Sequence, residues 1–281
     1  MDHLDLEPAA AAAQSGPEPT IEPGPDPLMS ASAGVAIPPS TEARRTLASD
    51  PNTPPDTLAV LAADPDWEVR MAVGFNPSTP EATLEHLADN GEADTVGLNW
   101  GASPELLTRI VAEHEYARDA VAMNPSAPPE LLDSLSENYP DYVAGNPAAP
   151  PETLARLAEL EPTVPTLVAE LDENITPAEY AISIRQLVAR HESCPPETLE
   201  RLADSQDAIV RSNVAANPAT PPETLERLVS DTRAVVRAHA AINPRASAAT
   251  LERLASDTNA DVRMQVALNS NTPAWIRDAL T

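Results

Sequence analysis

The chain has 281 residues, of which 44 are acidic and 17 basic, so its formal net charge at pH 7 is -27. Every basic residue is Arg, which excludes a Schiff-base lysine and a P-loop lysine, and the acidic balance argues against a nucleic-acid partner. The single cysteine, Cys194, excludes an internal disulfide and a Cys-rich metal centre. With no run of 18 apolar residues and no signal peptide, the sequence predicts a soluble, cytoplasmic protein without a membrane partner.

The first 40 residues differ in composition from the rest of the chain. They contain eight Pro, six acidic residues and no Arg. Such a segment buries too little apolar surface to offset the entropy that is lost on ordering. We therefore expect residues 1–40 to be a disordered, acidic, Pro- and Ala-rich tail, and residues 41–281 to form the folded part.

From about residue 42 the chain repeats a motif that opens with Pro-Pro-Glu-Thr-Leu or a related sequence. The key leucines of this motif are 22 to 26 residues apart, except across one longer interval. A period of this size is typical of a solenoid, in which each unit stacks only on its neighbours. The key leucines are Leu58, Leu84, Leu107, Leu132, Leu154, Leu199, Leu225 and Leu251.

The first half of each unit is predicted to be an α-helix. In the clearest copy, Thr220 is expected to be the N-cap, Pro221 to occupy the first helical position, and Glu223 to complete a capping box. Apolar residues then recur at i, i+3 and i+4, which places them on one face of a helix. Glu223 and Arg227 are four residues apart in the favourable order, so we expect them to pair on the solvated face.

The second half of each unit has the pattern Val-Arg-x-x-Val-x-x-Asn-Pro, as at 69–77 and 210–218. The Pro disfavours a helical conformation at the preceding Asn and therefore ends the segment. The segment lacks the alternation of polar and apolar residues that is typical of a strand. We therefore expect a short helix of one or two turns, which could have 3₁₀ geometry.

The two motifs together resemble the leucine-rich repeat variant family over about residues 42–281. The resemblance implies an all-α fold, in which α and 3₁₀ helices alternate in a right-handed superhelical solenoid of about nine two-helix repeats. It also implies that the chain is not an enzyme. Some members of the family carry an N-terminal cysteine cluster that holds an iron–sulfur centre. Because the only cysteine here is Cys194, inside a repeat, we expect no such cofactor.

Equivalent positions of successive units should form columns along the solenoid, and one such column consists of Asn. In one interpretation each buried amide satisfies backbone groups at a turn. In the other, as in armadillo-like solenoids, the column lines a groove and binds an extended peptide. The column runs through Asn76, Asn99, Asn124, Asn146, Asn217, Asn243 and Asn269.

A second column, six residues before the Asn, consists of Arg. Each Arg is expected to pair with a neighbouring carboxylate or with the carbonyl groups at a helix end. The alternative is an Arg-lined groove for an acidic peptide. The column runs through Arg44, Arg70, Arg118, Arg185, Arg211, Arg237 and Arg263.

Between about residues 90 and 190 the pattern fails. The interval from Leu154 to Leu199 cannot hold two full units, so one helix near Tyr180 is predicted to be shortened. Ala93, Pro140 and Leu167 stand where the pattern has Arg, and Glu173 and His191 stand where it has Asn. Trp100 stands where it has Pro.

Five of the chain's eight aromatic residues lie in this irregular stretch. Interfaces favour Tyr and Trp, and repeat proteins often bind through atypical repeats. Trp100, Tyr116, Tyr139 and Tyr142 are therefore candidate partner-binding residues. Alternatively, these aromatic side chains fill gaps in the core where leucines have been lost.

The sequence contains no nucleophile motif, and its His residues form no local metal pair. We therefore predict no catalytic residue, no metal and no cofactor. The favoured function is a scaffold that binds a protein or peptide, of unknown identity, through its extended concave surface. An acidic decoy or chaperone-like partner of a basic protein comes second, and an enzyme with an unrecognised site in residues 90–190 comes third. The last helix, 272–281, should cap the solenoid, with Trp275 and Ile276 facing the preceding unit.

Overall fold

The computed structural model describes residues 36–160 and 175–280. Most of the predicted tail, together with Leu167 and Glu173, lies outside the described residues. Within the described part every regular element is a helix. None of these helices is long and apolar enough to span a lipid bilayer.

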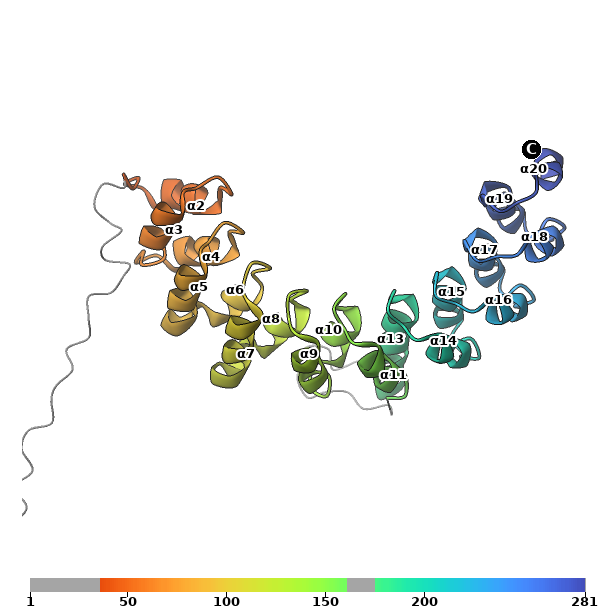
Figure 1. The fold of residues 1–281 in the computed structure, drawn as a ribbon, viewed down its shortest axis with the longest axis horizontal. Coiled ribbons are helices and arrows are strands. Elements are labelled where there is room, and N and C mark those ends of the chain that lie inside the picture. Colours follow the sequence, from red (N-terminus) through yellow and green to blue (C-terminus); the bar gives the residue numbers. More distant parts are fainter. Residues whose placement is uncertain (1–35, 161–174, 281) are drawn as a thin grey trace, which may run out of the picture.

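The helices form two rows that follow one arc (Figure 1). The first helix of each unit lies on the convex side. These first helices are α3 (Pro55–Leu61), α5 (Glu81–Leu87), α7 (Pro104–Glu113), α9 (Pro129–Leu135), α11 (Pro151–Ala158), α14 (Pro196–Leu202), α16 (Pro222–Leu228) and α18 (Ala248–Leu254).

The second helix of each unit lines the concave side (Figure 1). Two short elements, η1 (Ala88–Glu92) and η2 (Glu115–Ala117), precede the second helices of their units, and α20 (Ala274–Leu280) ends the arc. The second helices are α2 (Thr41–Ser49), α4 (Trp67–Phe75), α6 (Ala93–Gly97), α8 (Arg118–Met123), α10 (Pro140–Gly145), α13 (Pro177–Arg190), α15 (Ala208–Ala216), α17 (Ala234–Ile242) and α19 (Ala260–Leu268).

The expected helix pairs and their stacking are confirmed, but the start of the first helix is not as predicted. Pro221, not Thr220, is the N-cap of α16, and no side chain caps this helix. Thr220 is buried, and its hydroxyl donates to the carbonyl oxygen of Val214 at 2.5 Å. The hydroxyl therefore satisfies the C-terminal end of the preceding helix, and the predicted capping box at Glu223 does not form.

The 3₁₀ geometry expected for the second helices is also wrong. Helices α4, α15, α17 and α19 are each α-helical over nine residues. Among the described residues only η2 is a 3₁₀ helix. Each of these four second helices ends at an extended Asn, as its Pro or Ser neighbour allows.

The prediction of a shortened helix near Tyr180, in the interval between Leu154 and Leu199, is wrong. Helix α13 is not shortened: it has 14 residues and carries a capping box between Thr176 and Glu179. It packs against α10, α11, α14 and α15, which is the place of a second helix. One unit, α11 with α13, therefore fills the interval, and residues 161–174 lie between its two helices.

The core contains the key leucines of the first helices and small or β-branched residues of the second helices. At the C-terminal end, Ile276 is buried on α20 as expected, whereas Trp275 is 62% exposed and does not face the preceding unit. This prediction for Trp275 is therefore wrong.

The second helices α4 and α6 approach closely at Gly74, two residues before the C-cap of α4. A Cβ atom on Gly74 would lie 2.6 Å from Cγ2 of Thr95 on the next second helix. We expect Gly74→Ala to lower the free energy of unfolding by about 1–2 kcal/mol, because overpacking exceeds the gain in helix propensity.

Gly145 provides a matched control for this substitution. It ends the second helix α10, and a Cβ atom added there would have no neighbour within 4 Å. Gly145→Ala should therefore raise the free energy of unfolding by about 0.5 kcal/mol in urea titrations. Equal effects of the two substitutions would contradict close packing at Gly74.

Candidate binding surface

The Asn column forms a continuous buried ladder at the C-terminal ends of the second helices. Asn243 is representative: its amide donates to the carbonyl oxygens of Ala215 at 2.7 Å and Asn217 at 2.9 Å, both in the preceding unit. Its Oδ1 accepts the N–H of Arg245 at 2.8 Å. Equivalent pairs of bonds from the side-chain amide are made by Asn76, Asn99, Asn124, Asn146, Asn217 and Asn269.

His191 continues this ladder where the sequence pattern fails. Its Nε2 lies 2.8 Å from the carbonyl oxygen of Asn146, and its Nδ1 accepts the N–H of Ser193 at 3.1 Å. Asn217 in turn donates to the carbonyl oxygen of His191 at 2.9 Å. The imidazole therefore replaces the amide toward Asn146 and Ser193, the backbone carbonyl of His191 accepts the bond from Asn217, and the ladder passes directly from α10 to α13.

The geometry of the Asn ladder leaves no group for an extended peptide. Each Asn of the column is at most 4% exposed, and both of its amide hydrogens are directed at backbone carbonyl groups. An amide NH₂ group has two donors only. The armadillo-like role is therefore not available to these residues.

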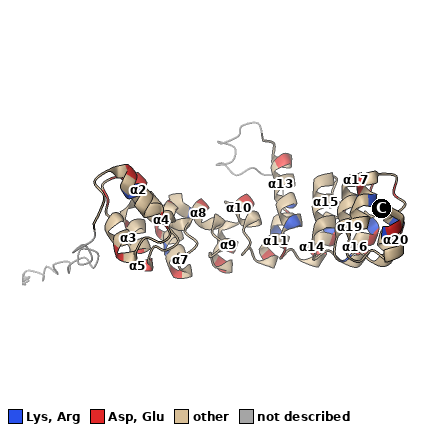
Figure 2. Ribbon diagram, turned by 90° about the horizontal axis from the view of Figure 1, so that it is seen from above, with Lys and Arg blue, Asp and Glu red and all other residues tan. Residues whose placement is uncertain are grey.

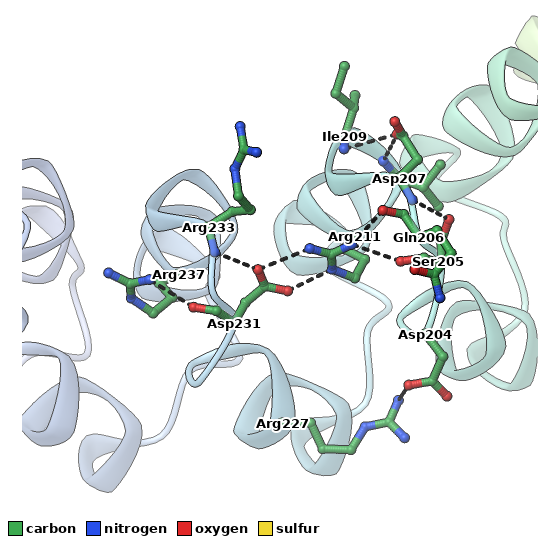
Figure 3. Close-up of polar contacts among 11 residues, drawn as sticks. Asp204, Ser205, Gln206, Asp207, Ile209, Arg211, Arg227, Asp231, Arg233 and Arg237 are labelled. Carbon is green, nitrogen blue, oxygen red and sulfur yellow. Dashed lines mark hydrogen bonds and ion pairs between the residues drawn. The ribbon is translucent and has the colours of Figure 1, made fainter. Parts of the chain in front are cut away.

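Over α15 and α17 the Arg column forms a second ladder, near the N-terminal ends of these second helices (Figure 3). Arg211 makes a bidentate pair with Asp231, with distances of 2.7 Å from Nε and 3.1 Å from Nη2, and its Nη1 donates to the carbonyl oxygen of Ser205 at 2.8 Å. The carbonyl oxygen of Asp231 in turn accepts Nη1 of Arg237 at 2.8 Å. One Asp therefore links two successive Arg residues, through its side chain and its backbone.

The same geometry recurs along the chain and accounts for the pKa values of the Asp residues. The hydrogen bond from Arg237 is the main reason that the pKa of Asp257 lies below its usual value. Burial alone would raise the pKa of Asp231, but hydrogen bonds from Arg211 and from the N–H of Arg233 lower it overall. These pairs are charge-assisted and largely buried, so the Arg side chains support neighbouring units rather than line an open groove.

The other Arg residues of the column bind either a carboxylate or backbone carbonyl groups, depending on the unit. Arg44 pairs with Asp64 and Arg70 with Glu92, both in the following unit. Arg185 donates to the carbonyl oxygens of Ala158 and Leu160, Arg118 to that of Val111, and Arg263 to those of Asp257 and Thr258.

The Arg residues of the first helices also connect units, which corrects the pairing expected within each helix. Arg227 lies 3.5 Å from Asp204, in the turn after the preceding first helix (Figure 3), and it forms no ion pair with Glu223 among the described residues. Arg201 pairs with Glu159, and Arg253 with Glu226, in the same way. These pairs are about half exposed, so each contributes little to stability.

The four aromatic candidates do not form one patch. Trp100, in the turn after α6, is 75% exposed, and Tyr116, in η2, is 56% exposed. Because these two residues lie at opposite ends of the second helices, they border different edges of the concave side. Tyr139 and Tyr142 are half-buried against the core and stack on each other with ring centroids 6.4 Å apart. The core-filling alternative therefore describes Tyr139 and Tyr142, but not Trp100 or Tyr116.

The concave side also carries exposed apolar residues that sequence reasoning missed. One set of them occupies the position immediately before the Asn ladder, where each side chain is at least partly exposed, whereas Trp67, Ile209, Val235 and Met264 are exposed elsewhere on the second helices. We call this set the apolar ridge; its signal in the sequence is the recurrence of a large apolar residue before Asn. The apolar ridge consists of Phe75, Leu98, Met123, Ile242 and Leu268.

Two groups that could act as a nucleophile or bind a metal ion lie outside the two ladders and the apolar ridge. Burial raises the pKa of the Cys194 thiol to about 12, so this thiol is a poor nucleophile. Asp89, Glu113 and His114 approach one another within 4.8 Å, but Arg109 already pairs with both carboxylates, at 2.6 Å and 3.3 Å. An Arg in this position neutralises the charge that would attract a metal ion.

Two family models match the chain. The model described as "Leucine Rich Repeat Variant domain" matches residues 42–96 and 101–141, and the model described as "Leucine rich repeat variant" matches residues 210–232. Both matches fall on the repeat units described above. Among curated proteins, none matches the chain significantly.

Several solved structures resemble the chain, and two of them are as follows. A protein titled "A leucine-rich repeat variant with a novel repetitive protein structural motif" is 22% identical, with a TM-score of 0.45, over 80% of this chain and 82% of that one. A designed armadillo repeat protein is 16% identical, with a TM-score of 0.18, over 90% and 98%. Because both TM-scores are below 0.5, the family models and not these structures identify the repeat.

Proposed function

We propose that this chain, which belongs to the leucine-rich repeat variant family, is a non-catalytic scaffold that binds a protein or peptide along its concave surface. The apolar ridge carries this proposal. Its side chains stand in one column on the second helices, they are partly or largely exposed, and they take no part in either ladder. A stable solenoid does not need large apolar side chains at a solvent-facing position, whereas a binding surface does.

The Asn and Arg ladders also support a binding role for the concave surface, because they make it rigid. They hold successive second helices in a fixed register through buried hydrogen bonds, and so they fix the spacing of the ridge residues. A rigid surface loses little conformational entropy on binding. The arrangement therefore resembles a preformed platform rather than a surface that orders only when a partner arrives.

A pair of matched double variants tests this proposal. Phe75→Ser with Leu268→Ser removes two ridge residues, whereas Trp67→Ser with Trp275→Ser removes two aromatic residues that are similarly exposed but outside the ridge. We expect proteins captured on the full-length chain from its source cells to be reduced about tenfold by the ridge variant and to remain with the control. Capture that is equal for both variants, or absent with micromolar bait, would refute binding through the ridge.

The acidic-decoy hypothesis predicts a different response. Acidic residues recur along the solenoid when it is viewed from the concave side (Figure 2). Binding by charge alone would collapse as salt rises to physiological strength and would not depend on Phe75 or Leu268. The same capture experiment at two salt concentrations therefore distinguishes the two functions.

A further inference from the structure

We propose that the N-terminal half of the concave surface, over α4, α6, α8 and α10, binds a basic amphipathic helix. The inference rests on the proposed function and adds the class of its partner. Two parallel lines of side chains carry it: one is the N-terminal part of the apolar ridge, Phe75, Leu98 and Met123, and the other is acidic.

The acidic line consists of Asp94, Asp119 and Asp141, one from each of three successive second helices. Asp94 lies four residues before Leu98, and Asp119 four residues before Met123, so each pair shares one face of its helix. The acidic line and the ridge therefore run side by side along the concave surface, about one helical turn apart.

These three carboxylates have no cationic partner in the described part of the chain. Asp119 accepts only the N–H of Ala120, and Asp141 accepts the hydroxyl of Tyr180 at 3.0 Å. The Asp residues of the Arg ladder, such as Asp64 and Asp257, are by contrast each paired with an Arg. A column of uncompensated negative charge beside an apolar line is complementary to a partner that presents a basic line beside an apolar line.

The spacing of the units favours a helix as this partner. Packed helices lie about 8–10 Å apart, so the three Asp residues repeat at about that interval. Seven residues of an α-helix rise by about 10.5 Å and return nearly to the same face, so basic residues at i, i+7 and i+14 meet the three units in turn. In an extended chain, three residues cover a similar distance but place successive side chains on opposite faces.

The C-terminal half of the concave surface lacks this combination. There the ridge continues through Ile242 and Leu268, but the positions equivalent to the acidic line carry uncharged residues. These residues are Gln186, Ser212, Ala238 and Met264. The basic helix should therefore bind to the N-terminal half alone.

The test uses a synthetic, fluorescein-labelled 18-residue helical peptide, with Arg at i, i+7 and i+14 and Leu along the adjacent face. A scrambled peptide of the same composition is the control. We expect the designed peptide to bind the full-length chain at least about tenfold more tightly than the scrambled one in fluorescence anisotropy titrations at physiological salt.

Two triple variants of equal charge locate the site. Asp94→Asn, Asp119→Asn and Asp141→Asn together should weaken binding of the designed peptide about tenfold or more. The control neutralises three exposed acids of the convex row in neighbouring units and should change affinity by less than about twofold. The control substitutions are Glu105→Gln, Glu130→Gln and Glu152→Gln.

Several outcomes would overturn the inference. Equal binding of the two peptides, or equal weakening by the two triple variants, would show attraction by diffuse charge. Failure of the designed peptide to bind, together with loss of captured proteins in the ridge variant, would reject the basic helix and leave the scaffold proposal standing. If the Asp triple variant loses helicity by circular dichroism, Asp119→Asn alone replaces it, and an unchanged affinity there would count against the site.

Discussion

Replacing Asn243 by alanine is expected to lower the free energy of unfolding by about 3 kcal/mol. The substitution removes two buried hydrogen bonds from the side-chain amide and one partly buried bond to Oδ1. It leaves the carbonyl oxygen of Ala215 and the N–H of Arg245 without these partners. A buried polar group that loses its partner costs about 1–3 kcal/mol, and the cavity adds to this cost.

Asn138 offers the matched control for this experiment. Its side chain is exposed and makes no hydrogen bond within the described residues, so Asn138→Ala should change the free energy of unfolding by less than about 0.5 kcal/mol. Urea titrations report the overall loss, and hydrogen exchange reports whether it is confined to the units around α17, as expected where each unit contacts only its neighbours. A loss below about 1 kcal/mol at Asn243 would contradict the structural role of the ladder.

The repeat and its columns could be predicted from the sequence because each rung uses one residue type at one spacing. Asn217, Asn243 and Asn269 are 26 residues apart, and stacking places their side chains against one another's backbone. The sequence places His191 at a position of the Asn column, but it does not show that the imidazole can take over the hydrogen bonds of the amide. Only the geometry shows that an imidazole with one donor and one acceptor can replace an amide at this position.

The errors in the prediction have a common physical cause, which is competition between neighbouring elements. Thr220 was expected to cap the helix that follows it, but its hydroxyl reaches the carbonyl oxygen of Val214 in the helix before it. Likewise, the length of α13 depends on its packing against both α10 and α11. Local sequence rules describe one helix at a time, so they do not decide which neighbour a side chain or helix end will satisfy.

The binding surface was harder to predict than the fold. Aromatic content pointed to Tyr139 and Tyr142, which pack against the core, whereas the apolar ridge escaped notice. Its members are Phe, Leu, Met and Ile, and polar or small residues interrupt it at three successive units, at Gly145, Arg190 and Ala216. A binding surface requires only exposed apolar area at a fixed position, so it leaves no fixed residue identity to recognise.

The second large effect on the free energy of unfolding is expected at Arg237, because its removal leaves a buried carboxylate without a cationic partner. Arg237 holds Asp257 through bonds of 2.6 Å and 2.9 Å, and the Asp257 side chain is only 8% exposed. We expect Arg237→Ala to lower the free energy of unfolding by about 3 kcal/mol at pH 7, since a buried charge without its partner is costly. Arg253→Ala is the control: its pair with Glu226 is about half exposed, and its loss should cost less than about 1 kcal/mol.

The pH dependence of this effect identifies its electrostatic origin. In the wild-type chain the folded-state pKa of Asp257 lies below the unfolded value of about 3.9, so the stability from this pair is present above about pH 4 and is lost as pH falls through the folded-state value. Without Arg237 the main cause of the lowered pKa of Asp257 is gone. Protonation of Asp257 then removes the unpaired buried charge of the variant, whereas in the wild type it removes the stabilising pair with Arg237. The difference between the two unfolding free energies should therefore shrink as urea titrations are repeated from pH 7 down to about pH 3. A difference that stays constant with pH would mean that Arg237 acts through the packing of its aliphatic stem and not through its charge.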